Sequence, residues 1–94
     1  MEAKLKVGDH VIFLDSRRKK HHALITAVWD VFPPDDEGVY HITDKQHPPS
    51  LNLVYVAEDT SREDQYGRQI ERTTSVVHRS LNQAGGNCWK LPTE

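Results

Sequence analysis

The chain has 94 residues, 36% of them hydrophobic and 28% charged, and its formal net charge at pH 7 is −2. This composition is typical of one small globular domain and excludes an intrinsically disordered chain. The slight acidity argues against a dedicated duplex-DNA binder, which normally carries a broad excess of lysine and arginine, so nucleic acid is not an expected partner. We expect a single domain over residues 1–94.

Several absences in the sequence bear on where the protein acts. No apolar run approaches the roughly 20 residues of a membrane helix, and the first residues lack the apolar stretch of a signal peptide. The single cysteine, Cys88, cannot form an internal disulfide. These features predict a cytoplasmic protein without membrane contact. So short a chain has a thin core, and a homo-oligomer would supply the missing buried surface.

The first half of the chain reads as a hairpin with a basic tip. A Gly8-Asp9 turn leads into an apolar strand that ends near residue 14. Residues 15–22 form a polar, cationic connection, and residues 23–29 again have the composition of a strand. Residues 32–38 combine two prolines with an acidic cluster and therefore predict a loop.

The second half contains the clearest strand. Residues 39–43 predict a short strand, and residues 44–50 predict a second loop stiffened by prolines. Residues 51–57 then alternate in polarity, which places two sets of side chains on opposite faces of the strand. The first set is Leu51, Leu53 and Tyr55, and the second is Asn52, Val54 and Val56.

The remaining segments complete a pattern of about five strands. Residues 58–67 predict a long polar loop in which residues 59–63 can start one helical turn, capped by Asp59 or Thr60. Residues 73–79 and 88–91 predict strands, with a turn at residues 83–87 between them. Short strands separated by turns favour a mainly β domain, a small antiparallel barrel or a curled sheet.

The opening stretch Lys6-Val7-Gly8-Asp9-His10-Val11-Ile12-Phe13 resembles the first strand of SH3-like and KOW-type barrels. In those barrels a Gly-Asp turn also precedes an apolar strand. The resemblance covers the first hairpin only. It implies an SH3-like barrel and carries no implication for function.

Many directional polar groups lie in or beside the apolar strands between His47 and Arg79. A buried polar group without a partner costs about 1–3 kcal/mol, so these groups need partners or a ligand. One interpretation is a nucleotide pocket, in which arginines pair with phosphate, a tyrosine stacks on a base, and amide and hydroxyl groups read ring or ribose atoms. The ligand-binding candidates are Asn52, Tyr66, Arg68, Arg72, Ser75 and Arg79, with Thr74 as a further polar group of the pocket. The alternative is that Asn52 and His78 are ordinary sheet residues and that the arginine stems cover apolar surface.

Catalysis is an alternative use of the same stretch. His78 follows Thr74 by four positions and has Arg79 beside it, so it is a candidate acid or base for a metal-independent phosphodiesterase. Regular strand alternation would place Thr74, Val76 and His78 on one face, which makes Thr74 the better partner of the histidine.

Two other kinds of site receive less support from the sequence. The six histidines lack the ligand spacing of a metal centre, so neither a metal nor a cofactor is expected. The basic tip over residues 17–20 gives a third reading, an SH3-like interaction module that contacts host protein or nucleic acid. A charged hairpin tip also serves solubility and protects a sheet edge.

The stretch over residues 49–56, continued by residues 64–69 and 74–78, resembles a group of small tailed-phage and prophage proteins. Small phage proteins include oligomeric sponges and enzymes that remove the nucleotide messengers of bacterial immunity. The resemblance thus implies a counter-defence protein in the cytoplasm of a bacterial host. Its expected partner is a nucleotide second messenger, a cyclic oligonucleotide or an ADP-ribose-type signal, which it sequesters or, alternatively, cleaves.

Overall fold

The structure is a computed structural model that describes residues 2–56, 63–64, 67–82 and 85–94, with the backbone alone described at residues 63, 64 and 68. These residues contain nine strands and one short 3-10 helix, joined by turns and loops. In chain order they are β1 (Ala3–Leu5), β2 (His10–Leu14), β3 (Lys20–Trp29), β4 (Tyr40–Ile42), β5 (Ser50–Val56), β6 (Glu63–Asp64), β7 (Gly67–Arg68), β8 (Ile70–His78), η2 (Arg79–Leu81) and β9 (Cys88–Lys90).

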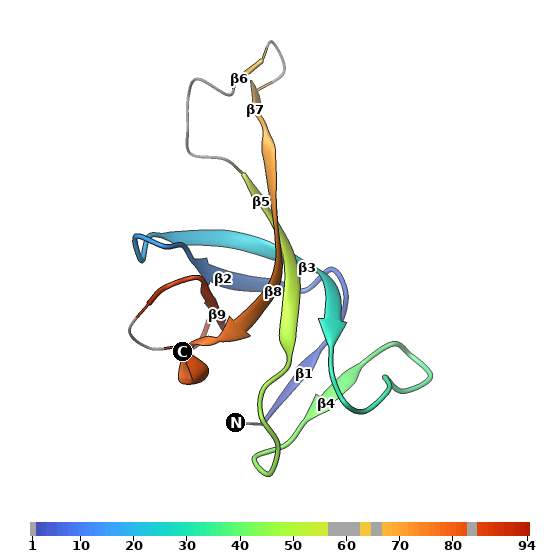
Figure 1. Ribbon diagram of the computed structural model, residues 1–94. Coiled ribbons are helices and arrows are strands. Elements are labelled where there is room, and N and C mark those ends of the chain that lie inside the picture. Colours follow the sequence, from blue (N-terminus) through green and yellow to red (C-terminus); the bar gives the residue numbers. More distant parts are fainter. Residues whose placement is uncertain (1, 57–62, 65–66, 83–84) are drawn as a thin grey trace.

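Five of the strands close into a barrel in the order β2-β3-β5-β8-β9 (Figure 1). The pairs β2–β3, β3–β5, β5–β8 and β2–β9 are antiparallel. The 3-10 helix η2 separates β8 from β9, which pair in parallel through Val77–Cys88 and His78–Trp89. This order, with a 3-10 turn before the last strand, is that of a small SH3-like barrel. The predicted mainly β fold and its five-stranded barrel are confirmed, but the barrel is mixed and not antiparallel throughout, because η2 turns the chain so that β9 runs parallel to β8.

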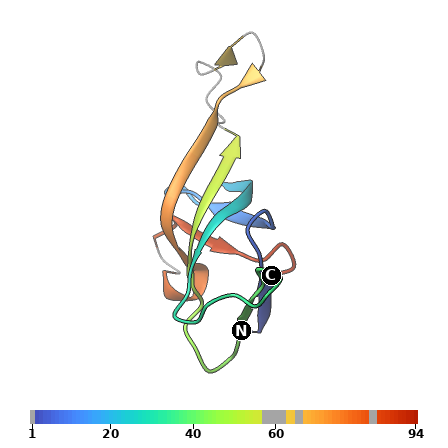
Figure 2. The ribbon, with the colours of Figure 1, turned by 90° about the vertical axis from the view of Figure 1, so that its right-hand side faces the viewer.

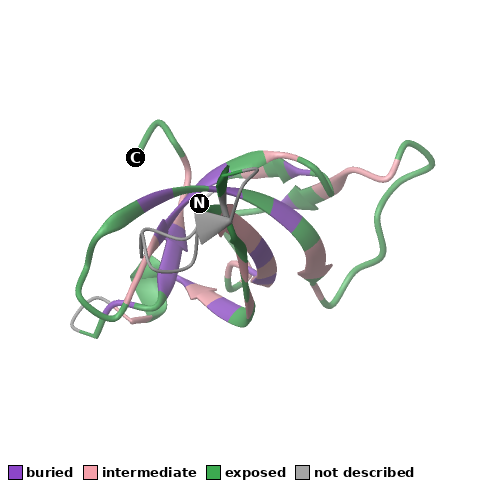
Figure 3. Ribbon diagram, turned by 90° about the horizontal axis from the view of Figure 1, so that it is seen from above, coloured by how far each residue is buried: buried purple, intermediate pink, exposed green. Residues whose placement is uncertain are grey.

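The core fills the barrel with large apolar side chains. Trp89 is fully buried, and its indole Nε1 donates a hydrogen bond to the Pro49 carbonyl oxygen at 3.1 Å. The predicted alternation along β5 is confirmed, because Leu51 and Leu53 are buried while Asn52 and Val54 are only half-buried. Buried and exposed residues also alternate along the first part of β3, and Figure 3 shows such changes of colour along the ribbon.

Two short strands form a small sheet outside the barrel. The predicted strand near residue 40 is β4, but its partner is β1, which the sequence did not reveal. Leu5 of β1 and Ile42 of β4 are buried and belong to the same core cluster as the barrel residues. The small sheet therefore adds apolar cover to the core that the five barrel strands enclose.

The hairpin of β5 and β8 is long and projects away from the barrel, as Figures 1 and 2 show. The two-residue strands β6 and β7 pair near its tip. Of the residues predicted to form a helical turn, 59–62 lie outside the described residues, and Glu63 begins β6. Among the described residues no helix has the length and apolarity needed to cross a membrane.

Candidate functional site

The most irregular part of the barrel surrounds Asn52 of β5. On one side, Ile25 pairs with Leu53 and Ala27 pairs with Asn52, so Thr26 is an extra residue of β3. On the other side, Leu51 pairs with Val76 and Leu53 with Thr73, so two residues of β8, Thr74 and Ser75, lie opposite Asn52 alone. Each neighbouring strand thus has a β-bulge at this level, a feature that is over-represented beside active sites.

The two bulges change which side chains face outward. On β3 the buried residues His21, Ala23 and Ile25 alternate with exposed residues. If this alternation continued unchanged to the end of the strand, Trp29 would also be buried. After the bulge the phase is reversed, so Val28 packs against the core and Trp29 is 60% exposed.

The bulge on β8 has the same effect. Thr74 is exposed, whereas Val76 and His78 are buried. The expectation that Thr74 and His78 share a face is therefore wrong, because the extra residue between Thr73 and Val76 reverses the alternation. Thr74 and His78 face different environments and do not form the acid–base pair that regular alternation suggested.

Asn52 ties the two bulged strands together through one oxygen. Its side-chain Oδ1 accepts a hydrogen bond from the Trp29 indole Nε1 at 2.9 Å and another from the Ser75 backbone N–H at 2.9 Å. Ser75 has a φ of 53°, a conformation that is uncommon outside glycine and is often found at functional sites. Among the described residues the Asn52 Nδ2 amide donates to no protein group, so its hydrogens are available to a ligand.

A groove of about 310 Å³ lies over the two bulges, and we call it the bulge groove. Its size is at the lower end of small-molecule sites. The exposed Arg72 supplies a cation, and threonine hydroxyl groups line both sides. The lining residues are Thr26, Asn52, Leu53, Val54, Arg72, Thr73 and Thr74. The bulge groove brings together three of the predicted site residues, Asn52, Arg72 and Thr74, with the Ser75 backbone beside them.

His78 lies apart from the bulge groove and is 3% exposed. Its Nδ1 accepts the Ser80 N–H at 3.2 Å and lies 2.8 Å from the Ser80 hydroxyl, while Nε2 donates to Glu94 Oε1 at 3.0 Å. Because Nδ1 accepts from the Ser80 backbone, the proton in the contact with Glu94 is carried by Nε2. The ring also packs edge-on against Trp89, with centroids 4.6 Å apart. Both nitrogens are engaged in holding the chain, so the geometry gives His78 a structural role.

Arg79 is also drawn to Glu94, since its Nε donates to Oε2 of that carboxylate at 3.0 Å. Burial of the Glu94 carboxyl opposes its ionisation, but hydrogen bonds from His78, the Leu91 N–H and Arg79 outweigh that effect and lower its pKa to about 2. The Glu94 carboxylate thus links the end of β8, η2 and the segment after β9 through hydrogen bonds.

These hydrogen bonds of Glu94 predict a loss of stability in acid. Because the pKa of Glu94 is lower in the folded chain than its ordinary value of 4.5, its contribution is complete above about pH 5 and disappears as the pH falls toward 2. We expect Glu94→Gln to have a lower Tm than the parent at pH 6, and the difference to shrink steadily toward pH 2. Thermal unfolding followed by circular dichroism checks this, and a constant difference across that range would contradict it.

The other predicted site residues cannot be placed in the groove. Tyr66 lies outside the described residues, and only the backbone of Arg68, in β7, is described. The described residues contain no group of three histidine, cysteine, aspartate or glutamate side chains able to hold a metal ion.

Beyond the bulge groove the same face of β3, β5 and β8 becomes apolar. Leu24, Val56 and Ile70 are 49%, 56% and 67% exposed, and Val54 joins the groove to them. Adjacent apolar side chains that remain exposed are typical of interaction surfaces. The homo-oligomer expected from the sequence remains a prediction.

Sequence reasoning missed two residues of this region, Trp29 and Thr26. Both stand in a segment of plain strand composition, so period-two alternation assigns Trp29 to the core. The bulge that exposes it depends on the pairing of β3 with β5, which nothing in the local sequence specifies. One sequence feature pointed to the bulge, because Thr26 and Ala27 are only weakly apolar whereas the residues on either side of them are strongly apolar.

Comparisons of this chain with family models, with curated proteins and with solved structures gave no match. The resemblance to small tailed-phage proteins therefore stays a prediction.

Proposed function

We propose that the protein is a binding module that holds a nucleotide in the bulge groove without changing it chemically. The observation that carries the proposal is the position of Trp29, an exposed aromatic ring fixed by a hydrogen bond to a residue that lines a cationic groove. An indole held in one orientation offers a stacking surface for a base at little entropic cost.

The groove supplies complementary groups for the rest of a nucleotide. Arg72 can pair with a phosphate through its planar fork of donors. The hydroxyl groups of Thr26 and Thr74 and the amide of Asn52 can donate to phosphate, ribose or ring atoms. This mixture of one cation, several neutral donors and one aromatic ring suits a nucleotide better than a purely apolar ligand.

Sequestration accounts for this arrangement better than cleavage does. The one histidine considered as acid or base, His78, is buried, and both of its ring nitrogens have protein partners. Thr74, the proposed helper, faces the groove on the other side of the strand from the buried histidine. The described residues that line the groove offer donors and no general base, so we expect the ligand to stay intact.

The biological setting that we propose is counter-defence, in which the module withdraws a nucleotide messenger of bacterial immunity. This setting rests on the resemblance of residues 49–56, 64–69 and 74–78 to small tailed-phage proteins. It selects the ligands for the first test, namely cyclic dinucleotides, cyclic trinucleotides and cyclic forms of ADP-ribose.

The test measures tryptophan fluorescence while each of these ligands is added. Trp29 is exposed and Trp89 is fully buried, so a base that stacks on Trp29 quenches the exposed component of the emission. We expect Trp29→Ala to weaken binding by about 5-fold to 150-fold, the range for losing one stacked base. We expect Arg72→Ala to weaken binding more than Trp29→Ala does, because a contact with phosphate is lost.

The matched control is Arg17→Ala, which removes the same charge from an exposed position outside the groove and should leave affinity unchanged. Ligand released by heating and analysed by chromatography should be recovered intact. Conversion by sub-stoichiometric protein would replace sequestration with catalysis. Failure of all these ligands to bind, or equal binding by Arg72→Ala, would overturn the proposal.

A further inference from the structure

Residues of β3, β5 and β8 form rows across the outer face of the sheet beside the bulge groove. In one row Leu24 pairs with Val54, and Val54 pairs with Arg72. The next row, two residues further along β5, contains Val56 opposite Ile70, and residues two apart on a strand share a face. On the other side of the first row are the two bulges. Arg72 therefore lies between the bulges and an apolar part of the same face.

This apolar part of the face, which we call the apolar strip, borders a cavity of about 150 Å³. The lining residues are His22, Leu24, Val54, Tyr55, Val56 and Ile70. Val54 also lines the bulge groove, so the two cavities are continuous. The volume is small for a complete ligand and suits one part of a larger ligand that also occupies the bulge groove.

A histidine ring gives the apolar strip a polar group. Nδ1 of His22 lies 2.8 Å from Nε2 of His10, and the two rings are stacked with their centroids 5.0 Å apart. Among the described residues, Nε2 of His22 has no protein partner and can form a hydrogen bond with a ligand. A nucleobase has flat apolar faces and a polar edge, so it can use both the aliphatic side chains and this nitrogen. An acyl chain can use only the side chains.

The position of Arg72 sets the order of the groups along this face. Asn52 and Val56 are four residues apart on one strand, a separation of about 13 Å, and Arg72 is paired with Val54, midway between them. No acidic group of the described residues pairs with Arg72, so its guanidinium is available to a phosphate. In a dinucleotide the phosphate also lies between two nucleosides. With that phosphate on Arg72, one base reaches toward Trp29 and the other lies on the apolar strip.

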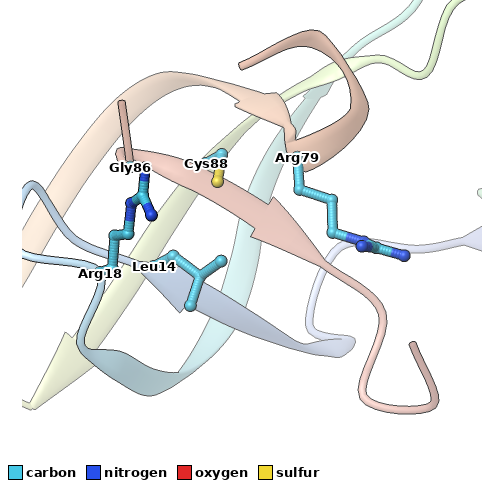
Figure 4. A pocket seen from close by; sticks show the side chains of 5 residues that line it. All are labelled: Leu14, Arg18, Arg79, Gly86 and Cys88. Carbon is cyan, nitrogen blue, oxygen red and sulfur yellow. The ribbon is translucent and has the colours of Figure 1, made fainter. Parts of the chain in front are cut away.

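A third groove, of about 330 Å³, is lined by Leu14, Arg18, Arg79, Gly86 and Cys88 (Figure 4). Its two arginines do not converge on one point, because Arg79 is paired with Glu94 and points away from Arg18 in Figure 4. None of its lining residues belongs to the bulge groove or to the apolar strip. The cavity that continues the nucleotide site is therefore the one along β5.

We propose that the apolar strip is a second base subsite and that the ligand of the bulge groove is a dinucleotide, two nucleosides joined through a phosphate on Arg72. This inference rests on the proposed nucleotide site and adds the size of its ligand. A base on the strip would cover Leu24, Val56 and Ile70, which are 49%, 56% and 67% exposed. Of the ligands in the first test, cyclic dinucleotides should therefore bind more tightly than cyclic ADP-ribose, which has one base.

The deciding variants are Leu24→Thr and Ile70→Thr. Each replaces an exposed apolar side chain of the strip with a polar, β-branched one that suits a strand. The matched control is Leu81→Thr, because Leu81 is 47% exposed, close to the 49% of Leu24, and lies on η2 outside both cavities.

The probes are the dinucleoside monophosphates ApA and GpG, compared with cyclic AMP and cyclic GMP, which have the same single phosphodiester charge but one base. Isothermal titration calorimetry measures the affinities. We expect at least one two-base probe to bind the parent about 10-fold or more tighter than its one-base counterpart. The two strip variants should lose about 5-fold or more of that affinity and bind the one-base probes as the parent does. Leu81→Thr should behave as the parent with every probe.

The outcomes separate this inference from the proposed function. Equal affinity for one-base and two-base probes, or unchanged binding of ApA and GpG by both strip variants, would overturn the second subsite and leave the nucleotide site intact. Absence of binding by all four probes and by the ligands of the first test would overturn both proposals. Light scattering after size-exclusion chromatography tests the other occupant of the strip. A dimer that Ile70→Thr converts to a monomer would assign the strip to a second copy and overturn the inference.

Discussion

Replacing Gly86 by alanine should reduce the free energy of unfolding by about 3 kcal/mol or more, a large part of the stability of so small a domain. A Cβ at this position would lie 2.3 Å from the Asp15 carbonyl oxygen, far inside van der Waals contact, and the φ of 71° is unfavourable for any side chain. The Asp15 carbonyl cannot move away freely, because it accepts hydrogen bonds from Arg18 and Asn87.

Gly38→Ala is the matched control for this change. Gly38 has a similar φ of 79°, but a Cβ built there meets no atom within 4 Å. Its substitution should therefore involve only the backbone term of about 1–2 kcal/mol. Urea denaturation of both variants, followed by circular dichroism, measures the difference. Equal losses would show that the contact between Gly86 and the β2–β3 turn is not tight.

Removing the carboxylate of Asp15 should have the second large effect, about 2–3 kcal/mol for Asp15→Ala. This carboxylate accepts two backbone N–H groups and lies 2.8 Å from Nε2 of His21, whose side chain is only 7% exposed. Without it, the two backbone donors of the turn and a buried ring nitrogen lose that acceptor together.

The turn over residues 35–39 provides the control, because Asp35 makes there the same set of hydrogen bonds that Asp15 makes over residues 15–19, and Asp35→Ala removes them. There the partner histidine, His41, is 52% exposed, so water can replace the lost contact. We expect a clearly smaller loss of stability for Asp35→Ala than for Asp15→Ala in the same denaturation experiment. If the two losses are equal, burial of the histidine does not determine the effect.

The barrel strands could be predicted because their apolar, β-branched runs report burial directly. Residues 51–57 are the clearest case, since polarity alternates through most of β5 and no bulge interrupts that strand. The pairing of β1 with β4 could not be predicted, because three-residue strands such as Ala3–Leu5 carry too little pattern. The two similar turns over residues 15–19 and 35–39 do have a recognisable sequence pattern, because each begins with an aspartate, at positions 15 and 35, that is followed six residues later by a histidine.

The candidate site was predictable only in part, and the reason lies in its bulges. Asn52 and Arg72 were identified as polar residues in apolar strands, and they do line one groove. Trp29 was missed because the extra residue of β3 reverses the alternation before it. Thr74 was wrongly assigned to the face of His78, because the extra residue between Thr73 and Val76 reverses the alternation before His78. His78 attracted attention as a polar group in a strand, but its main partner, Glu94, lies 16 residues away and has no local signature.

The closing pair of the barrel affects how the protein is made. β2 is completed on one side by β9, which is synthesised after the other four barrel strands, and the parallel pairing of β9 with β8 forms at the same step. Until then, Phe13 and its neighbours in β2 have an open edge that can pair with other chains. Folding through such distant contacts is slow, so we expect the nascent chain to need the most protection just before Trp89 is added to its core.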